Sequence, residues 1–376
     1  ITCRDWSSDV CSSDLLLAVT NSDETNLVAC MVANILSPST KKLARVRSAD
    51  YDHFNELFCN HPPHIETVIN PEMELVKTIE RLMSVPNATD VGEFAGGRVK
   101  FIGIRIDDGT PLAGARLLEL PQRISGHRPL IFAIVRDEAI IVPSGRDRLL
   151  PGDLVYFITD DEHLGESLRH FNMHADPIRR VLIVGGGRIA FRLARRLEER
   201  SVHVKIIEKR SDRCSLIAEK LDRTVVLCGD GSDQALLKEE NIQGTDMVVT
   251  LTDDDETTIL VSLLAKRLGA RKTITKISKF SYFPLMHTIG IDQVVDPRLS
   301  AVNSILQHIR RGKVLSSVSI RGEDAEIMEA VALETTDIVG KPLMEISLPK
   351  GILITTILRG DKVIIPSGKS VVAPND

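Results

Sequence analysis

The sequence VLIVGGGRIA at residues 181–190 is the strongest indication of the fold. Residues 180–184, an arginine followed by four apolar residues, are typical of a strand buried in a parallel sheet. The glycine loop that follows has the form Gly-x-Gly-x-x-Ala and leads into an amphipathic helix. A second strand-like run, 202–207, ends at Glu208. Strand, glycine loop, helix, strand and acid in this order predict a Rossmann-type dinucleotide-binding unit.

Each position of this loop has a physical reason. Gly185 allows the tight turn, Gly187 leaves room for a pyrophosphate, and Ala190 lets the helix pack against the strand. The helix N-terminus offers N–H groups and a partial positive charge to phosphate. Glu208 is placed to accept hydrogen bonds from the adenosine ribose and to repel a 2′-phosphate. NAD or NADH is therefore the expected ligand.

Further candidate contacts follow the next two strand-like runs. Asp230 comes after the third run and is either a contact to the base or ribose or a turn residue. Thr252 comes after the fourth and is expected to face the phosphate or ribose. Arg188 either reaches a phosphate or points to solvent. The predicted cofactor-binding residues of this unit are Gly185, Gly186, Gly187, Arg188, Ile189, Glu208, Asp230, Thr252 and Asp253.

No catalytic residue is predicted. The acidic run Asp253–Glu256 is more typical of a helix start, where it complements the helix dipole. No metal site is predicted either, because His61 and His64 flank Pro62-Pro63 without a third ligand at a useful spacing. The six cysteines form no CxxC pair and are expected to be reduced thiols in a cytoplasmic protein.

Composition excludes some classes of protein. The 376 residues suffice for two to four domains. A formal net charge of −5 argues against nucleic acid as a partner. No apolar run approaches the roughly 18 residues of a membrane span, so direct membrane insertion is not expected.

The chain repeats itself. TNSDET (20–25) returns as TDDDET (252–257), each between a strand-like and a helix-like run. VPSG (142–145) returns as IPSG (365–368), with an arginine upstream in both copies. Because the two pairs are offset by similar distances, we expect the whole unit to be duplicated.

The predicted fold class is α/β, with two Rossmann-type halves, each followed by a small β-rich α+β half. The first Rossmann-type half begins at its fourth strand and so lacks its N-terminal strands and glycine loop. The chain is expected to be a fragment truncated at both ends. The predicted divisions are a non-native leader at 1–14, the first Rossmann remnant at 15–80, a β-rich domain at 88–172, the second Rossmann domain at 178–312 and an incomplete β-rich domain at 316–376.

Specific motifs carry a family resemblance. Together with the glycine loop they are AVTNSDETN (18–26), ARVRS (44–48), VVLCGDGSDQALLKEENI (225–242) and DDDETTILVSLLAKRLGA (253–270). With these motifs the chain resembles the TrkA family, which belongs with the RCK (KTN) regulators of potassium channels and transporters. The resemblance implies tandem RCK N-terminal and C-terminal domains.

The resemblance also implies a function. It indicates a regulator and not an enzyme, cytoplasmic and peripheral on the inner face of the plasma membrane. Such subunits form homo-oligomeric rings on a Trk-type potassium-translocating membrane subunit, and NAD(H) gates transport. Site residues carried over to the first domain are Thr20, Asn21 and Arg45, the last facing phosphate. The counterpart of Arg45 in the second copy is either Thr275 or Lys276.

Two alternatives stay open. An NAD-dependent oxidoreductase would share the cofactor site but would need a substrate domain with a positioned acid or base. An RCK regulator of another potassium channel or antiporter would sense ATP or a cyclic dinucleotide. ATP is therefore a possible ligand alongside NAD. For the β-rich halves, dimerisation is favoured over ligand binding.

Overall fold

The computed structural model describes residues 15–48, 51, 54–85, 88–137, 139–173, 177–309, 314–320, 325–349 and 351–376. The expected leader at 1–14 lies outside these residues. The chain forms two compact units, residues 1–75 with 297–310 and residues 76–296 with 311–376. Among the helices that the structure describes, none is both long enough and apolar enough to cross a membrane.

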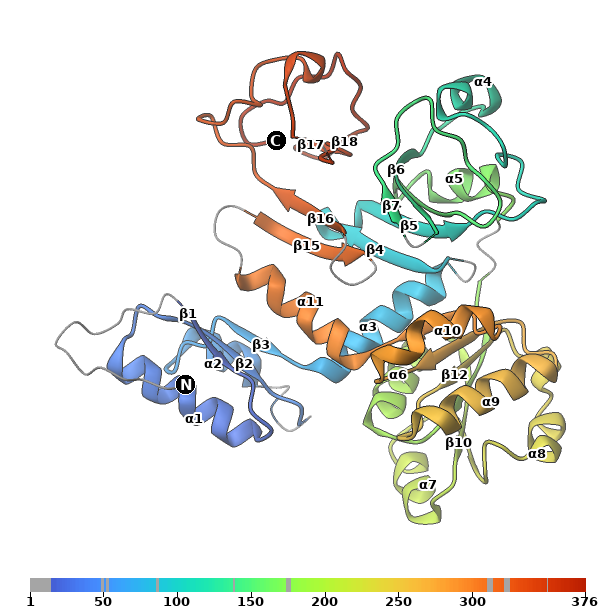
Figure 1. Ribbon diagram of the computed structural model, residues 1–376. Coiled ribbons are helices and arrows are strands. Elements are labelled where there is room, and N and C mark those ends of the chain that lie inside the picture. The colour runs from blue at the N-terminus through green and yellow to red at the C-terminus, as the bar shows by residue number, and fades with distance from the viewer. Residues whose placement is uncertain are drawn as a thin grey trace. The chain divides into compact units, whose positions relative to one another are not determined.

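The first unit contains a small parallel sheet with the strand order β1-β2-β3 (Figure 1). Ser22 begins its first helix by accepting a hydrogen bond from the backbone of Thr25, and two acids follow in the first turn. The core beneath that helix includes Cys30, Ala44 and Ile65. Its elements are β1 (Leu15–Ala18), α1 (Asp23–Leu36), β2 (Lys41–Arg45), α2 (Asn55–Asn60), β3 (Thr67–Ile69) and α11 (Pro297–Ile309), while α3 (Pro71–Ser84) begins in it.

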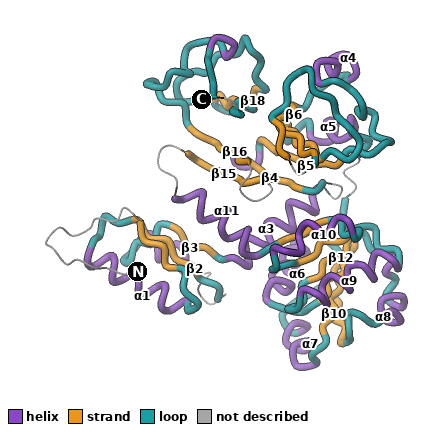
Figure 2. Tube along the Cα trace, viewed as in Figure 1, coloured by secondary structure: helices purple, strands orange, loops and turns teal. Residues whose placement is uncertain are grey.

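The second unit contains a complete Rossmann-type half. All pairings of its sheet are parallel, in the order β11-β10-β9-β12-β13-β14, and helices flank the strands (Figure 2). Its strands are β9 (Arg180–Val184), β10 (His203–Glu208), β11 (Val225–Cys228), β12 (Met247–Thr250), β13 (Thr273–Lys276) and β14 (Gln293–Val295). Its α-helices are α6 (Arg188–Glu199), α7 (Ser211–Ala218), α8 (Gln234–Glu239), α9 (Asp255–Arg267) and α10 (Phe283–Thr288).

The apolar run at 181–184 forms the centre of this sheet, as its sequence predicts. Both neighbours of β9 are strands, and Val181 to Val184 are each at most 3% exposed. A strand buried on both faces has no polar side to offer, which explains its unbroken apolar composition. Leu182 and Val184 join Val248, Val261 and other apolar side chains in the core of this half.

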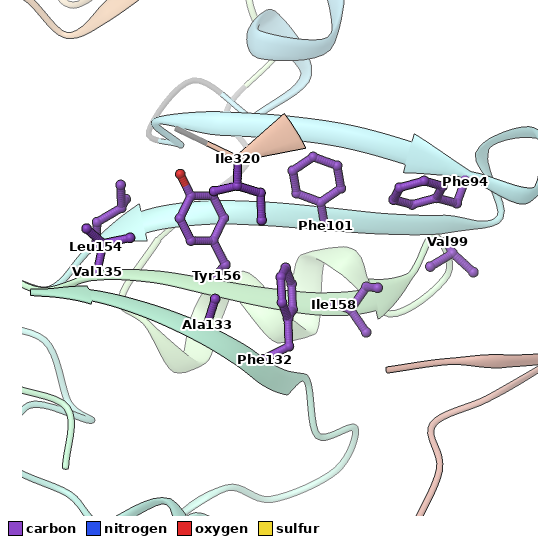
Figure 3. Close-up of a cluster of buried hydrophobic side chains, with 10 residues drawn as sticks. All are labelled: Phe94, Val99, Phe101, Phe132, Ala133, Val135, Leu154, Tyr156, Ile158 and Ile320. Atoms are coloured by element: carbon purple, nitrogen blue, oxygen red, sulfur yellow. The ribbon is translucent and has the colours of Figure 1, made fainter. Parts of the chain in front are cut away.

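The first β-rich half is an antiparallel sheet in the order β4-β5-β8-β6-β7. Its ten-residue apolar cluster includes Phe101, Phe132 and Tyr156, and Ile320 joins it from β15 (Val314–Ile320) (Figure 3). The Tyr156 hydroxyl donates a hydrogen bond of 2.5 Å to Asp90, so its polar end is satisfied. The elements are β4 (Asp90–Phe94), β5 (Val99–Arg105), α4 (Leu120–Arg123), β6 (Leu130–Arg136), β7 (Ala139–Ile141), β8 (Leu154–Asp160) and α5 (Leu164–His170).

The second β-rich half repeats a structural device of the first. Arg136 donates two hydrogen bonds to Asp153, at 2.8 and 2.7 Å, and Arg359 donates two to Asp376, at 2.9 and 2.7 Å. Each aspartate carboxylate is almost fully buried, so a paired guanidinium is needed to hold it. The duplicated arginine therefore has a shared structural role. The strands here are β15 (Val314–Ile320), β16 (Ala325–Ala330), β17 (Ile357–Arg359) and β18 (Lys362–Ile364).

Candidate functional site

The candidate site lies where strand order reverses. β9 has β10 on one side and β12 on the other, so the loops after β9 and β12 leave the sheet in opposite directions. Open parallel sheets bind ligands in the crevice outside the carboxyl ends of such strands. The predicted loop at 185–190 occupies this position, directly after β9.

Two glycines of the loop are required by close contacts. Gly185 has a φ of 101°, and a Cβ there would lie 2.9 Å from the carbonyl oxygen of Leu251 and 3.1 Å from the amide nitrogen of Thr252. A Cβ on Gly186 would lie 2.9 Å from Oε2 of Glu208. The loop after β9 is thus pressed against the chain that follows β12, which no side chain at Gly185 would permit.

Gly187 differs from its neighbours because it faces open space. A Cβ on this residue would meet no described atom within 4 Å, and its φ of −69° suits any residue. Gly187 is also the N-cap of α6, where it provides no capping side chain, and the described first turn holds no acid. An anion can therefore approach the positive end of this helix without displacing a protein group.

Glu208 is 9% exposed and closes the other side of the loop. Oε2 accepts a hydrogen bond of 2.6 Å from the Gly186 amide, and Oε1 accepts one of 2.8 Å from the Arg210 amide. An ionised carboxylate has about four acceptor positions, so these two bonds leave capacity for ribose hydroxyls. The same carboxylate also fixes the glycine loop, a role that the sequence did not indicate.

Asp230 lies in the turn after β11 and is engaged within the protein. Its carboxylate accepts hydrogen bonds from the amide and hydroxyl of Ser232, at 2.9 and 2.7 Å, and from Lys209 at 2.9 Å. These bonds, the Ser232 amide first, lower the pKa of Asp230 to about 2. The turn-residue interpretation thus has direct geometric support, and contact with a base or ribose stays a prediction.

Thr252 and Asp253 follow β12. The Thr252 hydroxyl donates to the carbonyl of Asp254 at 3.1 Å and lies 2.5 Å from the hydroxyl of Thr258. It is therefore directed toward the start of α9. Asp253 is exposed.

The acidic run after Thr252 begins a helix, as predicted. Asp254 is the N-cap of α9 and accepts a hydrogen bond from the Thr257 amide. Asp255 is buried and accepts from the amides of Ser278 and Lys279, at 3.0 and 2.9 Å. Glu256 pairs with the Lys279 amine at 2.6 Å, which together with the Tyr282 hydroxyl lowers its pKa to about 2. Three of these acids thus have structural partners.

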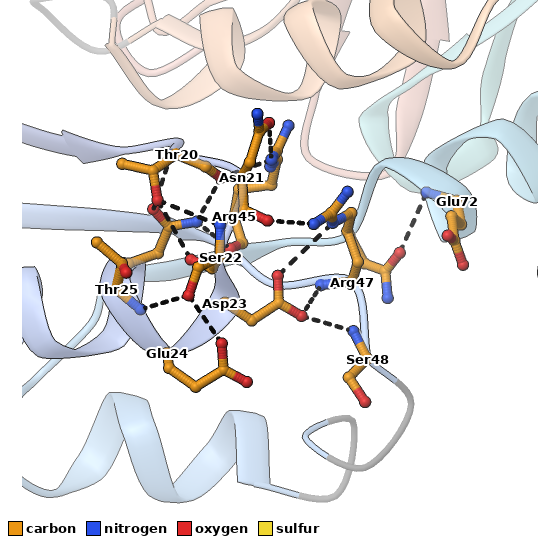
Figure 4. A network of polar contacts seen from close by, with 12 residues as sticks. Thr20, Asn21, Ser22, Asp23, Glu24, Thr25, Arg45, Arg47, Ser48 and Glu72 are labelled. Carbon is orange, nitrogen blue, oxygen red and sulfur yellow. Dashed lines mark hydrogen bonds and ion pairs between the residues drawn. The ribbon is translucent and has the colours of Figure 1, made fainter.

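The first unit repeats this arrangement (Figure 4). Asp23 is buried and accepts hydrogen bonds of 2.8 Å from the amides of Arg47 and Ser48, as Asp255 does from the loop after β13. Asn26 is fully buried and accepts 2.7 Å bonds from the amide and hydroxyl of Thr20. A polar network therefore fixes the turn after β1 to the end of β2.

Two arginines converge on this turn. Arg45 donates to the carbonyl of Thr20 at 2.5 Å and to the Asn21 side chain at 3.3 Å, and Arg47 donates to the carbonyl of Asn21. The buried Nε of Arg45 has no hydrogen-bond partner in the described part of the chain. Burial, followed by the charge of Arg47, lowers the pKa of the Arg45 guanidinium. An anion placed here would relieve the repulsion between the two guanidinium groups.

The structure identifies the counterpart of Arg45 in the second copy. Arg45 pairs with Ile69, and the next residue donates its amide to the Ile69 carbonyl. Lys276 pairs with Val295, and the residue after it donates to the Val295 carbonyl. Lys276 and not Thr275 therefore occupies the position of Arg45, with a single amine in place of a guanidinium.

Sequence reasoning did not single out Gly231, Asn26 or the anchoring carboxylates Asp23 and Asp255. A Cβ on Gly231 would lie 2.2 Å from Val184, so this glycine lets the turn after β11 approach β9. The repeated motif contains both aspartates at the same position, which was a signal for a shared role. The partners lie more than 20 residues away, and periodicity carries no information about them.

Known proteins resemble the chain throughout. The TrkA-N domain family matches residues 181–297, and the TrkA-C domain family matches residues 101–172 and 327–376. The Trk system potassium uptake protein TrkA of Halomonas elongata is 38% identical over 97% of this chain and 80% of its own length. The protein of the same name from Vibrio alginolyticus is 36% identical, with the same coverage of both chains.

Solved structures share the fold. The GsuK RCK domain has a TM-score of 0.55 at 16% identity and covers 96% of this chain and 75% of its own. The GsuK channel bound to NAD has a TM-score of 0.57 at 18% identity and covers 96% of this chain and 63% of its own. The predicted architecture of tandem Rossmann-type RCK units with β-rich partners is confirmed. On its identity to the Halomonas and Vibrio proteins over 97% of its length, the chain belongs to the TrkA family.

Proposed function

We propose that this protein is a nucleotide-sensing regulatory subunit of a potassium uptake system, and that its second Rossmann-type half binds NAD or NADH. One observation carries the ligand assignment. The glycine loop lies at the reversal of strand order, with open space at Gly187 beside the uncapped start of α6. This is the geometry that a pyrophosphate needs. The GsuK channel, which shares the fold, is bound to NAD.

The proposed contacts follow from that placement. The pyrophosphate would lie against Gly185 to Ile189, and Glu208 would accept hydrogen bonds from the ribose. Thr252 and Asp253 directly follow β12, and the Thr252 amide nitrogen would lie 3.1 Å from a Cβ on Gly185, so both residues would be near the same ligand. When bound, the dinucleotide supplies charge and shape to be recognised, and no hydride transfer is required of it. The chain itself leaves space for the ligand beside Gly187, while Gly185 and Gly186 are in close contact with the rest of the protein.

A second nucleotide contact is proposed in the first unit, at Thr20, Asn21 and Arg45. Its support is the convergence of two guanidinium groups, those of Arg45 and Arg47, on the turn at Thr20 and Asn21. The described part of this unit holds β1, β2 and β3, which correspond to β12, β13 and β14, and no glycine loop. In the first unit an anion would therefore meet arginine side chains, whereas in the second copy it would meet the glycine loop.

The proposed domain divisions are 15–80, 88–172, 178–312 and 316–376.

The regulatory role rests on the family. Relatives are named as potassium uptake proteins of Trk systems. We propose a homo-oligomeric ring of this chain, peripheral on the cytoplasmic face of the plasma membrane, bound to a Trk-type translocating subunit. Nucleotide binding would shift the ring between conformations that differ in affinity for the nucleotide. A ligand can change a distant gate only through such a difference in affinity.

A non-enzymatic role agrees with how the acids are used. Asp254 caps α9, Asp255 holds two amides, and Glu256 is paired with Lys279. A general acid or base must reach the proton that it transfers, and these groups are committed elsewhere. The alternatives of an NAD-dependent oxidoreductase and of an ATP-sensing regulator are outcomes of the tests below.

Calorimetry on the full chain tests the ligand site. Gly187→Val should fold normally, because its Cβ meets no described atom within 4 Å, yet its side chain would occupy the space of the pyrophosphate. We expect NADH binding to weaken by roughly 100-fold or more, a loss of about 3 kcal/mol. Gly109→Val is the matched control, since its Cβ also meets nothing nearby. Equal NADH affinity in both variants would refute the site, and tighter binding of ATP than NADH would favour the ATP-sensing alternative.

Potassium transport tests the regulatory role. Proteoliposomes containing a Trk-type translocating subunit would be assayed for potassium flux with this protein, with and without NADH. The expected result is a nucleotide-dependent change in flux that Gly187→Val abolishes and Gly109→Val retains. Potassium flux that does not change when this protein is added would refute the regulatory proposal. NADH turnover with hydroxy acids would favour the oxidoreductase alternative.

A further inference from the structure

A cluster of metal-ligating side chains lies in the first β-rich half. His127 precedes β6, Asp160 ends β8, and His163 directly precedes α5. One ligand atom from each of the three lies within 4.8 Å of the other two. His127 is distant in the sequence from the other two, so packing of the sheet brings it to them.

The donor atoms lie close to one another. His163 Nδ1 lies 2.6 Å from Oδ1 of Asp160, and His127 Nε2 lies 3.9 Å from Oδ2 of the same carboxylate. The two imidazole rings stack, with centroids 4.1 Å apart and an angle of 9° between the planes. The carboxylate thus lies near one nitrogen of each ring. Because the ring planes are nearly parallel, one imidazole must turn before both nitrogens can bind the same ion.

One of these nitrogens is not satisfied within the protein. His127 Nε2 is buried and has no hydrogen-bond partner among the residues that the structure describes. A buried polar atom without a partner costs about 1–3 kcal/mol. Oδ2 of Asp160 lies 3.9 Å from this nitrogen, which is too far for a hydrogen bond but near enough for both atoms to bind one ion.

The backbone around the cluster is held in place. The His127 amide donates a hydrogen bond of 3.0 Å to Oε1 of Glu166, and the His127 carbonyl oxygen lies 3.0 Å from Nε2 of His170. Gly126 has a φ of 83°, and a Cβ there would lie 1.8 Å from the same Glu166 oxygen. The loop before β6 is therefore shaped to bring His127 against α5.

We propose that His127, Asp160 and His163 bind a divalent transition-metal ion of the zinc class. A tetrahedral ion with bonds of about 2.0–2.1 Å separates its ligand atoms by about 3.4 Å, which lies between the 2.6 and 3.9 Å observed around Asp160. Two imidazoles with one carboxylate select zinc-like ions over calcium or magnesium, which take oxygen ligands. Three protein ligands leave the fourth position to water.

A bound ion would join two parts of this domain. It would tie the loop before β6 to the turn between β8 and α5, beside the end of a sheet strand. The competing explanation is a hydrogen-bonded turn without metal, because Asp160 also accepts 2.8 Å from the His163 amide. The two explanations differ in whether the three side chains bind an ion together.

Metal analysis after equilibrium dialysis of the full chain against Zn²⁺ tests the proposal. The variants are His127→Gln, Asp160→Asn and His163→Gln, with His203→Gln as control because His203 is exposed in another domain. We expect the parent and the control to bind one equivalent that each of the other variants loses, with affinity lowered by about 100-fold or more, beyond the effect of a supporting residue. Asp160→Asn keeps an oxygen for the His163 amide, so it should fold even where a histidine variant does not.

Co²⁺ provides a second measurement. Bound at this cluster it should give visible d–d absorption without a thiolate charge-transfer band, and Asp160→Asn should lose that absorption. Equal zinc binding by the parent and all variants would overturn the proposal. A thiolate band that persists in Asp160→Asn would also overturn it, because it would place the ion at a cysteine.

Discussion

Gly185→Ala should destabilise the second Rossmann-type half more than its small size suggests. The residue has a φ of 101°, and the added Cβ would lie 2.9 Å from the Leu251 carbonyl oxygen and 3.0 Å from its carbon. Both clashing atoms belong to the backbone next to β12, which cannot rotate away as a side chain would. The strain therefore falls on the contact between β9 and β12, at the centre of the sheet.

The magnitude follows from three contributions. A non-glycine residue in this conformation costs about 1–3 kcal/mol, and forced overpacking costs about 1–3 kcal/mol more. Lower entropy of the unfolded alanine chain offsets about 0.4–1 kcal/mol. The expected loss is near 3 kcal/mol, which corresponds to roughly 100-fold faster exchange of protected amides.

Hydrogen exchange read by mass spectrometry on peptides from β9 and β12 is the suitable assay, because a chain with several domains need not unfold in one step. Gly187→Ala is the control: its φ of −69° and open surroundings predict a change within about 0.5 kcal/mol. Exchange in Gly185→Ala that matches the parent and the control would show that a Cβ at this position does not strain the contact between the loop and the backbone after β12.

Two further predictions concern acids of the candidate site. Glu208→Gln keeps an oxygen for the Gly186 amide but removes the charge, so NADH binding should weaken about tenfold while NADPH binding improves; an unchanged NADH-to-NADPH ratio by calorimetry would contradict the ribose role. Asp230 should titrate near pH 2 in carboxyl-detected NMR. Because its pKa is lowered on folding, its stabilisation of the turn is complete above the unfolded value of 3.8 and is lost as pH falls toward 2. Ser232→Ala should raise that midpoint, and a midpoint that does not move would show that the hydroxyl bond is unimportant.

Local patterns predicted the fold well because they reflect local physics. The glycine loop, the acids that begin α1 and α9, and the apolar strand at 181–184 each depend on neighbouring residues alone. The duplication was likewise visible, since TNSDET and TDDDET build the same turn. The paired arginines mark the limit of local patterns. The sequence shows Arg136 and Arg359 as a repeat, but only the structure shows that each pairs with a buried aspartate.

The family, the order of the Rossmann-type and β-rich halves and the position of the glycine loop can all be predicted from local sequence patterns. Which distant residues meet is evident only in the folded chain. The fold brings Glu208 to the Gly186 amide and His127 close to Asp160. It also shows that Lys276 has the same position in its own sheet that Arg45 has in the sheet of the first unit. The physical reason is that short-range periodicity encodes how a segment folds. Contacts between segments depend instead on how sheets and helices pack, which no single segment specifies.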